Sequence, residues 1–428
     1  MKNKTNIFLF PLGILAGVIF YAIAIYLFPN NRNDFINIFF IKLIVMSIWV
    51  FILNKKKLLG FFVLIITLLS VVVIGVFFKG FVSGYFNQEF KTNSTLPVPN
   101  MFEDCDSIID VYRYDLKVFR PNLKINKDSV INEIKMKMDP VISLTEPQYR
   151  GLMNDPDFRI LSDSTFNIFQ DRIPYFNEIK NGFCRYKNFL RMDTINNLNN
   201  EDLINFVVYL NEDIFKLNQP NFTPPFVPIN FAINPDDNSQ WLLMGLHWFL
   251  GKDHVFYQSI PDYLRFRYDS IYMSSMIFNS IGNNYLGSNN MFNAQDDSFL
   301  ASMISSAKPY FFAKCMLPEV EDYRIFGFTK FTDLDGNIYN EIEFAHENEA
   351  FFWKDIILTS DLLYSSNIDL KELYINPGPA INCPSRLGVW IGYQILHDYY
   401  QNNKELTLVE IMLESDYQKI LNQSNYQP

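Results

Sequence analysis

The four histidines of this 428-residue chain are the side chains best suited to hold a metal or move a proton, so their spacing matters. A common type of zinc protease needs two histidines one helical turn apart with a glutamate between them. The nearest string runs from His346 to Ala350 (HENEA), with alanine at the second ligand position. Acidic residues favour the first turn of a helix. We therefore interpret this string as the start of an aromatic helix.

Other catalytic motifs are also missing from the sequence. Neither a Gly-x-Ser-x-Gly nucleophile elbow nor a phosphate-binding loop occurs. The stretch from Asp333 to Asn340 (DLDGNIYN) resembles a calcium loop, but it lacks the required spacing of acids and the glutamate at the twelfth position. Its Asp-Gly pair is typical of a turn between two strands. We expect no catalytic residue, no cofactor and no metal ligand.

Two aromatic-rich segments, 241–267 and 384–400, carry scattered polar residues and could line a binding cleft. Arg386 and Gln394 interrupt an otherwise apolar helix. A buried helix with satisfied polar groups is the favoured interpretation, because no nucleophile or metal set lies near them in the sequence. If a cleft exists instead, the candidate binding residues are His247, Asp253, Glu349, Arg386, Trp390 and Gln394.

Gly388 and Gly392 stand one helical turn apart in the second of these segments. Each glycine costs a helix up to ~1 kcal/mol relative to alanine, so a helix with both is expected to use them for close contact. We expect the aromatic helix at 349–364 to make that contact and Trp390 to be buried. Arg386 should reach an acidic residue such as Glu349, because a lone buried charge is costly.

The four cysteines do not form a recognisable metal or redox motif. No Cys-x-x-Cys pair occurs among Cys105, Cys184, Cys315 and Cys383. Cys315 lies on an apolar helical stretch and is expected to be a buried thiol. Cys105 could form a disulfide with another cysteine, but the sequence does not choose the partner.

The first 80 residues have the composition of membrane-spanning segments. The long apolar runs at 7–28, 35–53 and 58–78 approach or exceed the ~20 residues that cross a bilayer as a helix. Lysines precede the first run and fill the loop at 55–57, and lysine-rich short loops stay cytoplasmic. We therefore expect three transmembrane helices in a bacterial inner membrane, a cytoplasmic N-terminus and a periplasmic remainder.

The rest of the chain has the mixed composition of a globular domain. We expect a linker at 81–100 and a domain at 101–428 with a mainly helical α+β fold. The net charge of −10 disfavours a nucleic-acid partner. The expected partners are other membrane or envelope proteins, together with the lipid bilayer through residues 7–78. A strand is predicted at 108–119. Helices are predicted at 129–137, 200–217, 270–285, 298–316, 342–363, 385–401 and 408–423.

Several stretches of the domain resemble the GldB family of Bacteroidetes gliding-motility lipoproteins. They include GLHWFLGKDHVFYQSIPDYLRFRYDSIYM, ISSAKPYFFAKCMLPE, ENEAFFWKDIILTSDLLYS and CPSRLGVWIGYQILHDYY. Their order and spacing hold from about Phe158 to Pro428. The chain departs from the family in two respects. Three apolar segments replace the usual lipid anchor, and His247 stands where an acidic residue is usual.

This family is distantly similar to zincin proteases, and the resemblance has a structural implication. The metal helix would fall at 272–285, with Asn279, Ser280 and Asn283 in the ligand, base and second-ligand positions. Amides and hydroxyls are poor zinc ligands. The resemblance thus implies a degenerate zincin-like domain without its metal. We expect a non-enzymatic, membrane-anchored envelope protein related to gliding motility or type IX secretion that binds an envelope protein or glycan. The alternative is a membrane-anchored hydrolase with an atypical site.

Overall fold

The structure is a computed structural model, and it describes most of the chain from residue 96 onwards. The described residues are 96–101, 105, 109–113, 115–116, 128–129, 132, 145–170, 172–193, 204–208, 229–233, 240–291, 296–332, 338–359, 362–366, 368–376, 384 and 386–428. They belong to Ser94–Pro428, one of the two units into which the chain divides. The runs at 7–28, 35–53 and 58–78, and most of the expected linker at 81–100, lie outside the described residues.

Four short strands form a mixed sheet. They are β1 (Ile109–Arg113), β2 (Ile204–Val208), β3 (Ile229–Ile233) and β4 (Gln240–Met244), in the order β1-β2-β4-β3. The first three in this order are parallel, and β3 runs antiparallel to β4.

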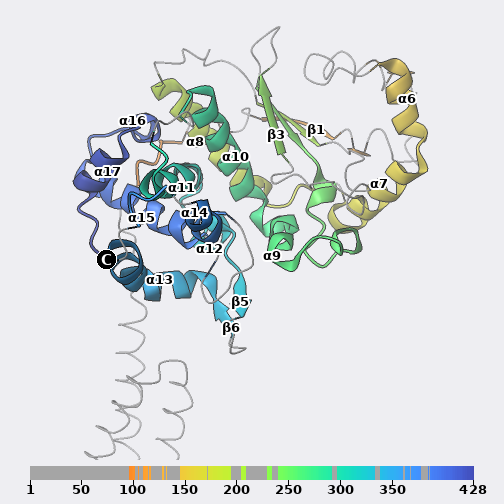
Figure 1. The fold of residues 1–428 in the computed structure, drawn as a ribbon. Helices are drawn as coiled ribbons and strands as arrows, with labels where there is room; N and C mark the ends of the chain where they lie inside the picture. Colours follow the sequence, from red (N-terminus) through yellow and green to blue (C-terminus); the bar gives the residue numbers. More distant parts are fainter. Residues whose placement is uncertain are drawn as a thin grey trace, which may run out of the picture. The chain divides into compact units, whose positions relative to one another are not determined.

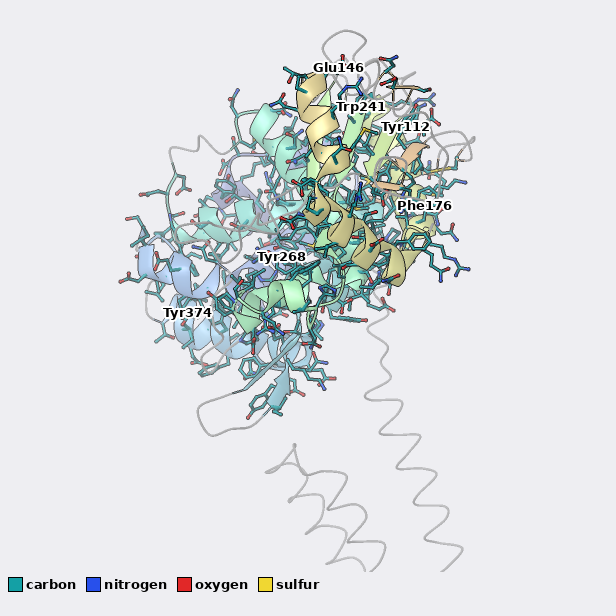
Figure 2. The ribbon with its side chains drawn as sticks, turned by 90° about the vertical axis from the view of Figure 1, so that its right-hand side faces the viewer. Tyr112, Glu146, Phe176, Trp241, Tyr268 and Tyr374 are labelled. Carbon is teal, nitrogen blue, oxygen red and sulfur yellow. A yellow bond between two sulfur atoms is a disulfide. The ribbon has the colours of Figure 1, made fainter. Side chains whose placement is uncertain are left out.

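Residue type and burial explain why these segments are strands. The end of β2 is a β-branched and aromatic run whose last three residues are all buried, as expected of a strand covered on both faces. The ring of Tyr112 in β1 stacks on Trp241 in β4 at 6.2 Å between centroids (Figure 2). The helix predicted at 200–217 is therefore wrong at 204–208, where tertiary pairing gives a strand.

Between β1 and β2 in sequence, the described part of the chain includes the helices α6 (Glu146–Asn154), α7 (Pro156–Phe169) and α8 (Phe176–Met192). The break between α6 and α7 has a local cause. Asp155 accepts a hydrogen bond from the Asp157 amide at 2.8 Å, and Pro156 occupies the first helical position, where its missing N–H costs nothing.

Three long helices form the centre of the domain: α10 (Met273–Ser288), α11 (Phe299–Met316) and α15 (Leu387–Asn402). In Figure 1, α11 lies beside α15, and α10 packs against both α11 and β3. Ser298 caps α11 by accepting from the Ala301 amide at 3.1 Å. Most residues of α11 are themselves buried, which is typical of a central core helix.

Shorter elements complete the domain. They are α9 (Asp262–Arg265), α12 (Asp322–Phe326), α13 (Glu341–Phe351), α14 (Ile368–Tyr374), α16 (Leu408–Leu413), α17 (Tyr417–Ser424), a π-helical turn at Phe352–Leu358, and 3₁₀ turns at Leu246–Trp248, Val255–Tyr257, Phe266–Tyr268 and Ser270–Tyr272. Strands β5 (Lys330–Thr332) and β6 (Ile338–Asn340) pair antiparallel on either side of the Asp-Gly pair, so the predicted strand pair is confirmed.

The predicted fold class needs correction. The structure gives a mainly helical α+β domain with a small mixed sheet. None of its described helices is both long and apolar enough to cross a membrane. The most apolar ones, such as α11 and α15, pack against each other in the core. A three-helix transmembrane segment joined to a degenerate zincin-like domain is therefore wrong as the fold class.

The cysteines divide into a bonded pair and a thiol. Cys105 forms a disulfide with Cys184 of α8, which supplies the partner that the sequence left open. Cys315 on α11 is a free, fully buried cysteine, as predicted. Burial raises the pKa of its thiol, so it is unreactive.

Candidate functional site

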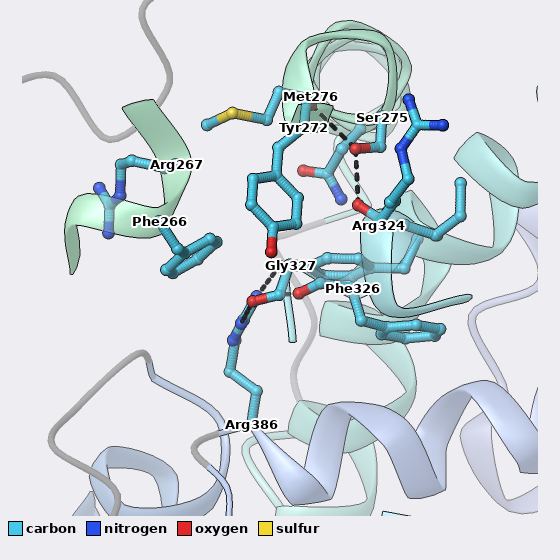
Figure 3. A pocket seen from close by; sticks show the side chains of 12 residues that line it. Phe266, Arg267, Tyr272, Ser275, Met276, Arg324, Phe326, Gly327 and Arg386 are labelled. Carbon is cyan, nitrogen blue, oxygen red and sulfur yellow. Dashed lines mark hydrogen bonds between the residues drawn. The ribbon is translucent and has the colours of Figure 1, made fainter. Parts of the chain in front are cut away.

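A small pocket, partly open to solvent, lies where α10, α12, α15 and the Phe266–Tyr268 turn meet (Figure 3). Its lining combines aromatic rings, three arginines and one amide. The residues are Phe266, Arg267, Tyr272, Ser275, Met276, Asn279, Tyr310, Arg324, Ile325, Phe326, Gly327 and Arg386.

The start of α10 supplies one wall of this pocket. Tyr272, Ser275, Met276 and Asn279 follow the spacing that places side chains on one helical face. Tyr272 donates to the Phe328 carbonyl at 3.3 Å, and its ring meets Phe266 edge-on at 5.5 Å. The wall is therefore largely apolar, and the hydroxyl of Tyr272 is already in use.

Arg386 forms the opposite side from the start of α15. Its guanidinium donates to the carbonyls of Phe326 and Gly327 and to the Tyr310 hydroxyl, while Nε has no hydrogen-bond partner among the described residues. Those carbonyls end α12, where backbone acceptors are left over and carry partial negative charge. The expectation that Arg386 reaches Glu349 is therefore wrong, because the end of a helix satisfies the cation instead.

The other two arginines differ in how their charge is balanced. Arg324 makes two hydrogen bonds to Glu178, at 2.7 and 2.9 Å. Burial alone would lower the pKa of Arg324, but the contacts with Glu178 outweigh it and raise that pKa. Arg267 is only 4% exposed. Burial lowers its pKa, and the neighbouring charge of Arg386 lowers it further.

The charge of the pocket is therefore positive. No Asp or Glu occurs among the twelve residues that line it. The Nδ2 atom of Asn279, a residue that is 7% exposed, also lacks an acceptor within the described part of the chain. An unsatisfied buried donor costs about 1–3 kcal/mol. The pocket thus presents hydrogen-bond donors and basic side chains, and its described lining holds no acidic side chain.

Of the predicted cleft residues, only Arg386 lines this pocket. Glu349 and Trp390 come together in a second cluster, in which Glu349 accepts from Trp390 Nε1 at 3.2 Å and from the Tyr426 hydroxyl at 2.8 Å. Burial raises the pKa of Glu349, and these two hydrogen bonds oppose that rise. Trp390 is fully buried, as predicted.

The remaining predicted residues do not join either cluster. His247 is fully buried near the end of β4, Asp253 is exposed, and Gln394 is half-buried on α15. Sequence reasoning missed Arg267 and gave Asn279 no binding role. The available signal was Arg267 itself, an arginine within the aromatic-rich segment 241–267.

The residues at the expected metal positions do not fit zinc. Asn283 Nδ2 donates to Asn279 Oδ1 at 3.0 Å, so the better metal-binding atom of Asn279 is engaged by a neighbouring amide. Within the described ranges, no group of three or more His, Cys, Asp or Glu side chains could hold a metal. Amide oxygens are also weak ligands for zinc.

Ser275, the one serine that lines the pocket, is not activated as a nucleophile. Ser275 Oγ lies 2.9 Å from the Tyr272 carbonyl and 2.7 Å from the Arg324 carbonyl. An activated serine donates to a general base such as histidine. The hydrogen bonds of Ser275 instead join α10 to α12 and support the wall of the pocket (Figure 3).

The comparisons with known proteins identify the family. The family model described as gliding motility protein GldB matches residues 99–428. The chain belongs to the GldB family. Its relation to gliding motility follows from that membership. No curated protein and no solved structure matches the chain. Within this GldB-family domain, the matched residues include every one that lines the pocket.

Proposed function

We propose that this GldB-family chain serves gliding motility as a non-enzymatic binding protein of the cell envelope, with its pocket as the recognition site. The observation that carries the proposal is the pairing of Asn283 with Asn279 beside a pocket with three arginines and no acid. Such a lining can bind a ligand, but it offers neither a general base nor an activated nucleophile.

A location outside the cytoplasm fits the same proposal. Disulfides form and persist in oxidising compartments such as the bacterial periplasm. The bond between Cys105 and Cys184 therefore favours a periplasmic domain. The partners that we propose are other envelope components, and type IX secretion is the related process in which they could act.

Gene replacement in the source organism tests the proposal. We expect Met276→Trp, which fills the pocket from the α10 wall, to stop gliding. Asn284→Trp is the matched control, because Asn284 is exposed on the same helix and does not line the pocket. Both proteins must accumulate to normal amounts. Gliding that survives Met276→Trp would show that the pocket is not the recognition site.

The hydrolase alternative predicts a different result. An enzyme that uses the pocket would depend on its hydroxyl nucleophile, so Ser275→Ala would abolish gliding even when the protein accumulates normally. A binding protein keeps gliding in Ser275→Ala, because that hydroxyl faces two carbonyls rather than a ligand. The colony-spreading phenotype of this variant therefore separates the two functions.

A further inference from the structure

We propose that the helix formed by α13 and the π-helical turn after it is a dimerisation surface, on which the same helix of a second copy of this chain packs antiparallel. The proposal goes beyond the proposed function, because none of the residues that line the pocket belongs to this helix. Exposed apolar side chains, the order of the charges around them and the π-helical turn carry it.

The exposed side of this helix has a regular pattern. α13 runs without a break into the π-helical turn and lies at the edge of the domain in Figure 1. Most of its exposed residues recur at intervals of three or four, the spacing that places side chains on one helical face. They are Glu343, Glu347, Phe351, Lys354 and Leu358, and Asp355 is exposed beside Lys354.

Two large apolar side chains stand on this face. Phe351 is 57% exposed and Leu358 is 47% exposed. On the inner side of the same helix, Phe352, Trp353 and Ile357 are buried in the core. Packing Phe351 and Leu358 against another apolar surface would remove them from water, which is favourable. The face is therefore suited to a partner with apolar side chains.

The charges on this face select the partner. Glu347 precedes Phe351 by about one helical turn, and Lys354 follows it by about one turn. Within the described part of the chain, the side chains of Glu347 and Lys354 make no ion pair or hydrogen bond. If two copies of the helix lie antiparallel with the two-fold axis beside Phe351, Glu347 of each copy lies opposite Lys354 of the other. A two-fold contact repeats every interaction, so this ion pair occurs twice.

Other partners fit these charges less well. A parallel pair of the same helices would place Glu347 beside Glu347 and Lys354 beside Lys354, and like charges oppose such a contact. A membrane surface is disfavoured, because the face carries three acids and one lysine and anionic lipids repel acids. Surface ion pairs add little affinity, but they fix the orientation of a contact whose apolar side chains supply the attraction.

The π-helical turn is a second feature of the same surface. The Thr359 amide donates to the Lys354 carbonyl at 3.1 Å, five residues earlier instead of the usual four. Such turns are rare and often lie at functional sites. Here the wider turn keeps Ile357 in the core while Lys354 and Leu358 stay exposed. The turn therefore forms the half of the face that presents the lysine to the second copy.

Cysteine cross-linking of the full-length chain in intact cells tests the antiparallel arrangement. Phe351→Cys places two thiols at the two-fold axis, so we expect a reducible species of twice the chain mass after mild oxidation. Glu343→Cys is the matched control, because it is exposed on the same helix but its two copies lie roughly 20 Å apart in the antiparallel pair. A disulfide joins Cα atoms no more than about 7 Å apart. Equal cross-linking of both variants, or of neither, would overturn the proposal.

Charge reversal tests the pairing of Glu347 with Lys354. Glu347→Lys and Lys354→Glu each place like charges opposite one another in the dimer, so each variant should raise the dissociation constant about tenfold. A mixture of the two variants should associate as strongly as the parent, because both ion-pair contacts of the mixed dimer join opposite charges. Light scattering of the purified full-length chain over a range of concentrations gives the dissociation constants.

The apolar contact has its own pair of variants. Phe351→Glu should abolish association, whereas Ile160→Glu, at a similarly exposed apolar position of α7, should leave it unchanged. If the parent is monomeric at every concentration, a second copy is not the partner of this face. If the parent associates but Phe351→Glu and both charge reversals leave the dissociation constant unchanged, the chain dimerises through another surface and the proposal fails.

Discussion

Gly392 of α15 lies directly against the backbone carbonyl of Met303 in α11, and a Cβ atom at position 392 would overlap that carbonyl. The two central helices meet so closely only because this position has no side chain. The close contact expected of Gly392 is therefore present, but its partner is α11 rather than the aromatic helix at 349–364.

This contact predicts that Gly392→Ala destabilises the domain by ~2 kcal/mol or more. The new methyl group would overlap the main chain of Met303, which cannot move aside as the end of a flexible side chain can. Gly151→Ala is the matched control. A Cβ at Gly151 in α6 meets nothing within 4 Å, and alanine there should stabilise by about 0.5–1 kcal/mol. Denaturant unfolding measures both changes. If Gly392→Ala and the parent unfold at the same denaturant concentration, the packing of α15 does not depend on this contact.

A second prediction concerns Lys308, which is buried in α11 and donates to the carbonyls of Met412 and Glu414. Burial lowers its pKa from 10.5 to about 7, although Glu414 opposes this shift. At pH values between about 7 and 10.5, Lys308 is protonated in the unfolded chain but not in the folded chain. The free energy of unfolding should therefore rise as the pH increases from 7 to 9.

Lys308→Met tests the origin of that pH dependence, because it removes the titrating amine and should flatten the rise. Lys314→Met is the matched change on the same helix. It breaks the 2.9 Å ion pair with Asp322 and should lower stability while keeping the pH dependence. Urea unfolding at pH 7, 8 and 9 gives the comparison. An unchanged slope in Lys308→Met would assign the effect to another group.

The disulfide gives a third prediction. Cys105 and Cys184 are 79 residues apart in sequence, and closing a loop of this length stabilises a fold by ~4 kcal/mol in the chain-entropy description. We expect Cys105→Ser to lower the Tm, and reductant to lower the Tm of the parent by the same amount. Reductant should then have no further effect on Cys105→Ser. If reductant does not change the Tm of the parent, the disulfide between Cys105 and Cys184 does not stabilise the domain.

The cluster around Glu349 gives a fourth prediction. Tyr426→Phe removes the 2.8 Å hydrogen bond to this buried carboxyl and should destabilise by about 1–3 kcal/mol. Tyr364→Phe is the control, since its hydroxyl donates to Gln418 at 2.8 Å at the surface, where losses are within about 0.5 kcal/mol. If the two variants have similar denaturant midpoints, the Tyr426 hydroxyl contributes no more to stability than a surface contact does.

Local patterns in the sequence predicted the elements whose causes are local. Helix α11 begins and ends within a residue of the predicted range 298–316, because Ser298 caps it and its apolar run is long. The π-helical turn after α13 and the break between α16 and α17 were missed. Strand β2 was predicted as part of a helix, since a short apolar run fits either structure until its neighbours are known.

The site could be predicted only in part, because its residues are distant in sequence. Arg386 was recognised as a polar residue on an apolar helix, but its partners come from α12, sixty residues earlier. Nothing in the local sequence of either segment specifies that contact. The pairing of Asn279 with Asn283, in contrast, follows from their spacing of one helical turn.

The disulfide also changes the route by which the sheet can form. Strand β1 pairs in parallel with β2, so Ile109 must find Ile204 across a long stretch of chain. Once Cys105 is bonded to Cys184, the path between the two strands shortens to the few residues before β1 and the stretch between 184 and 204. A shorter effective loop costs less entropy to close and speeds non-local pairing. Oxidation before collapse should therefore make this sheet an early rather than a late product of folding.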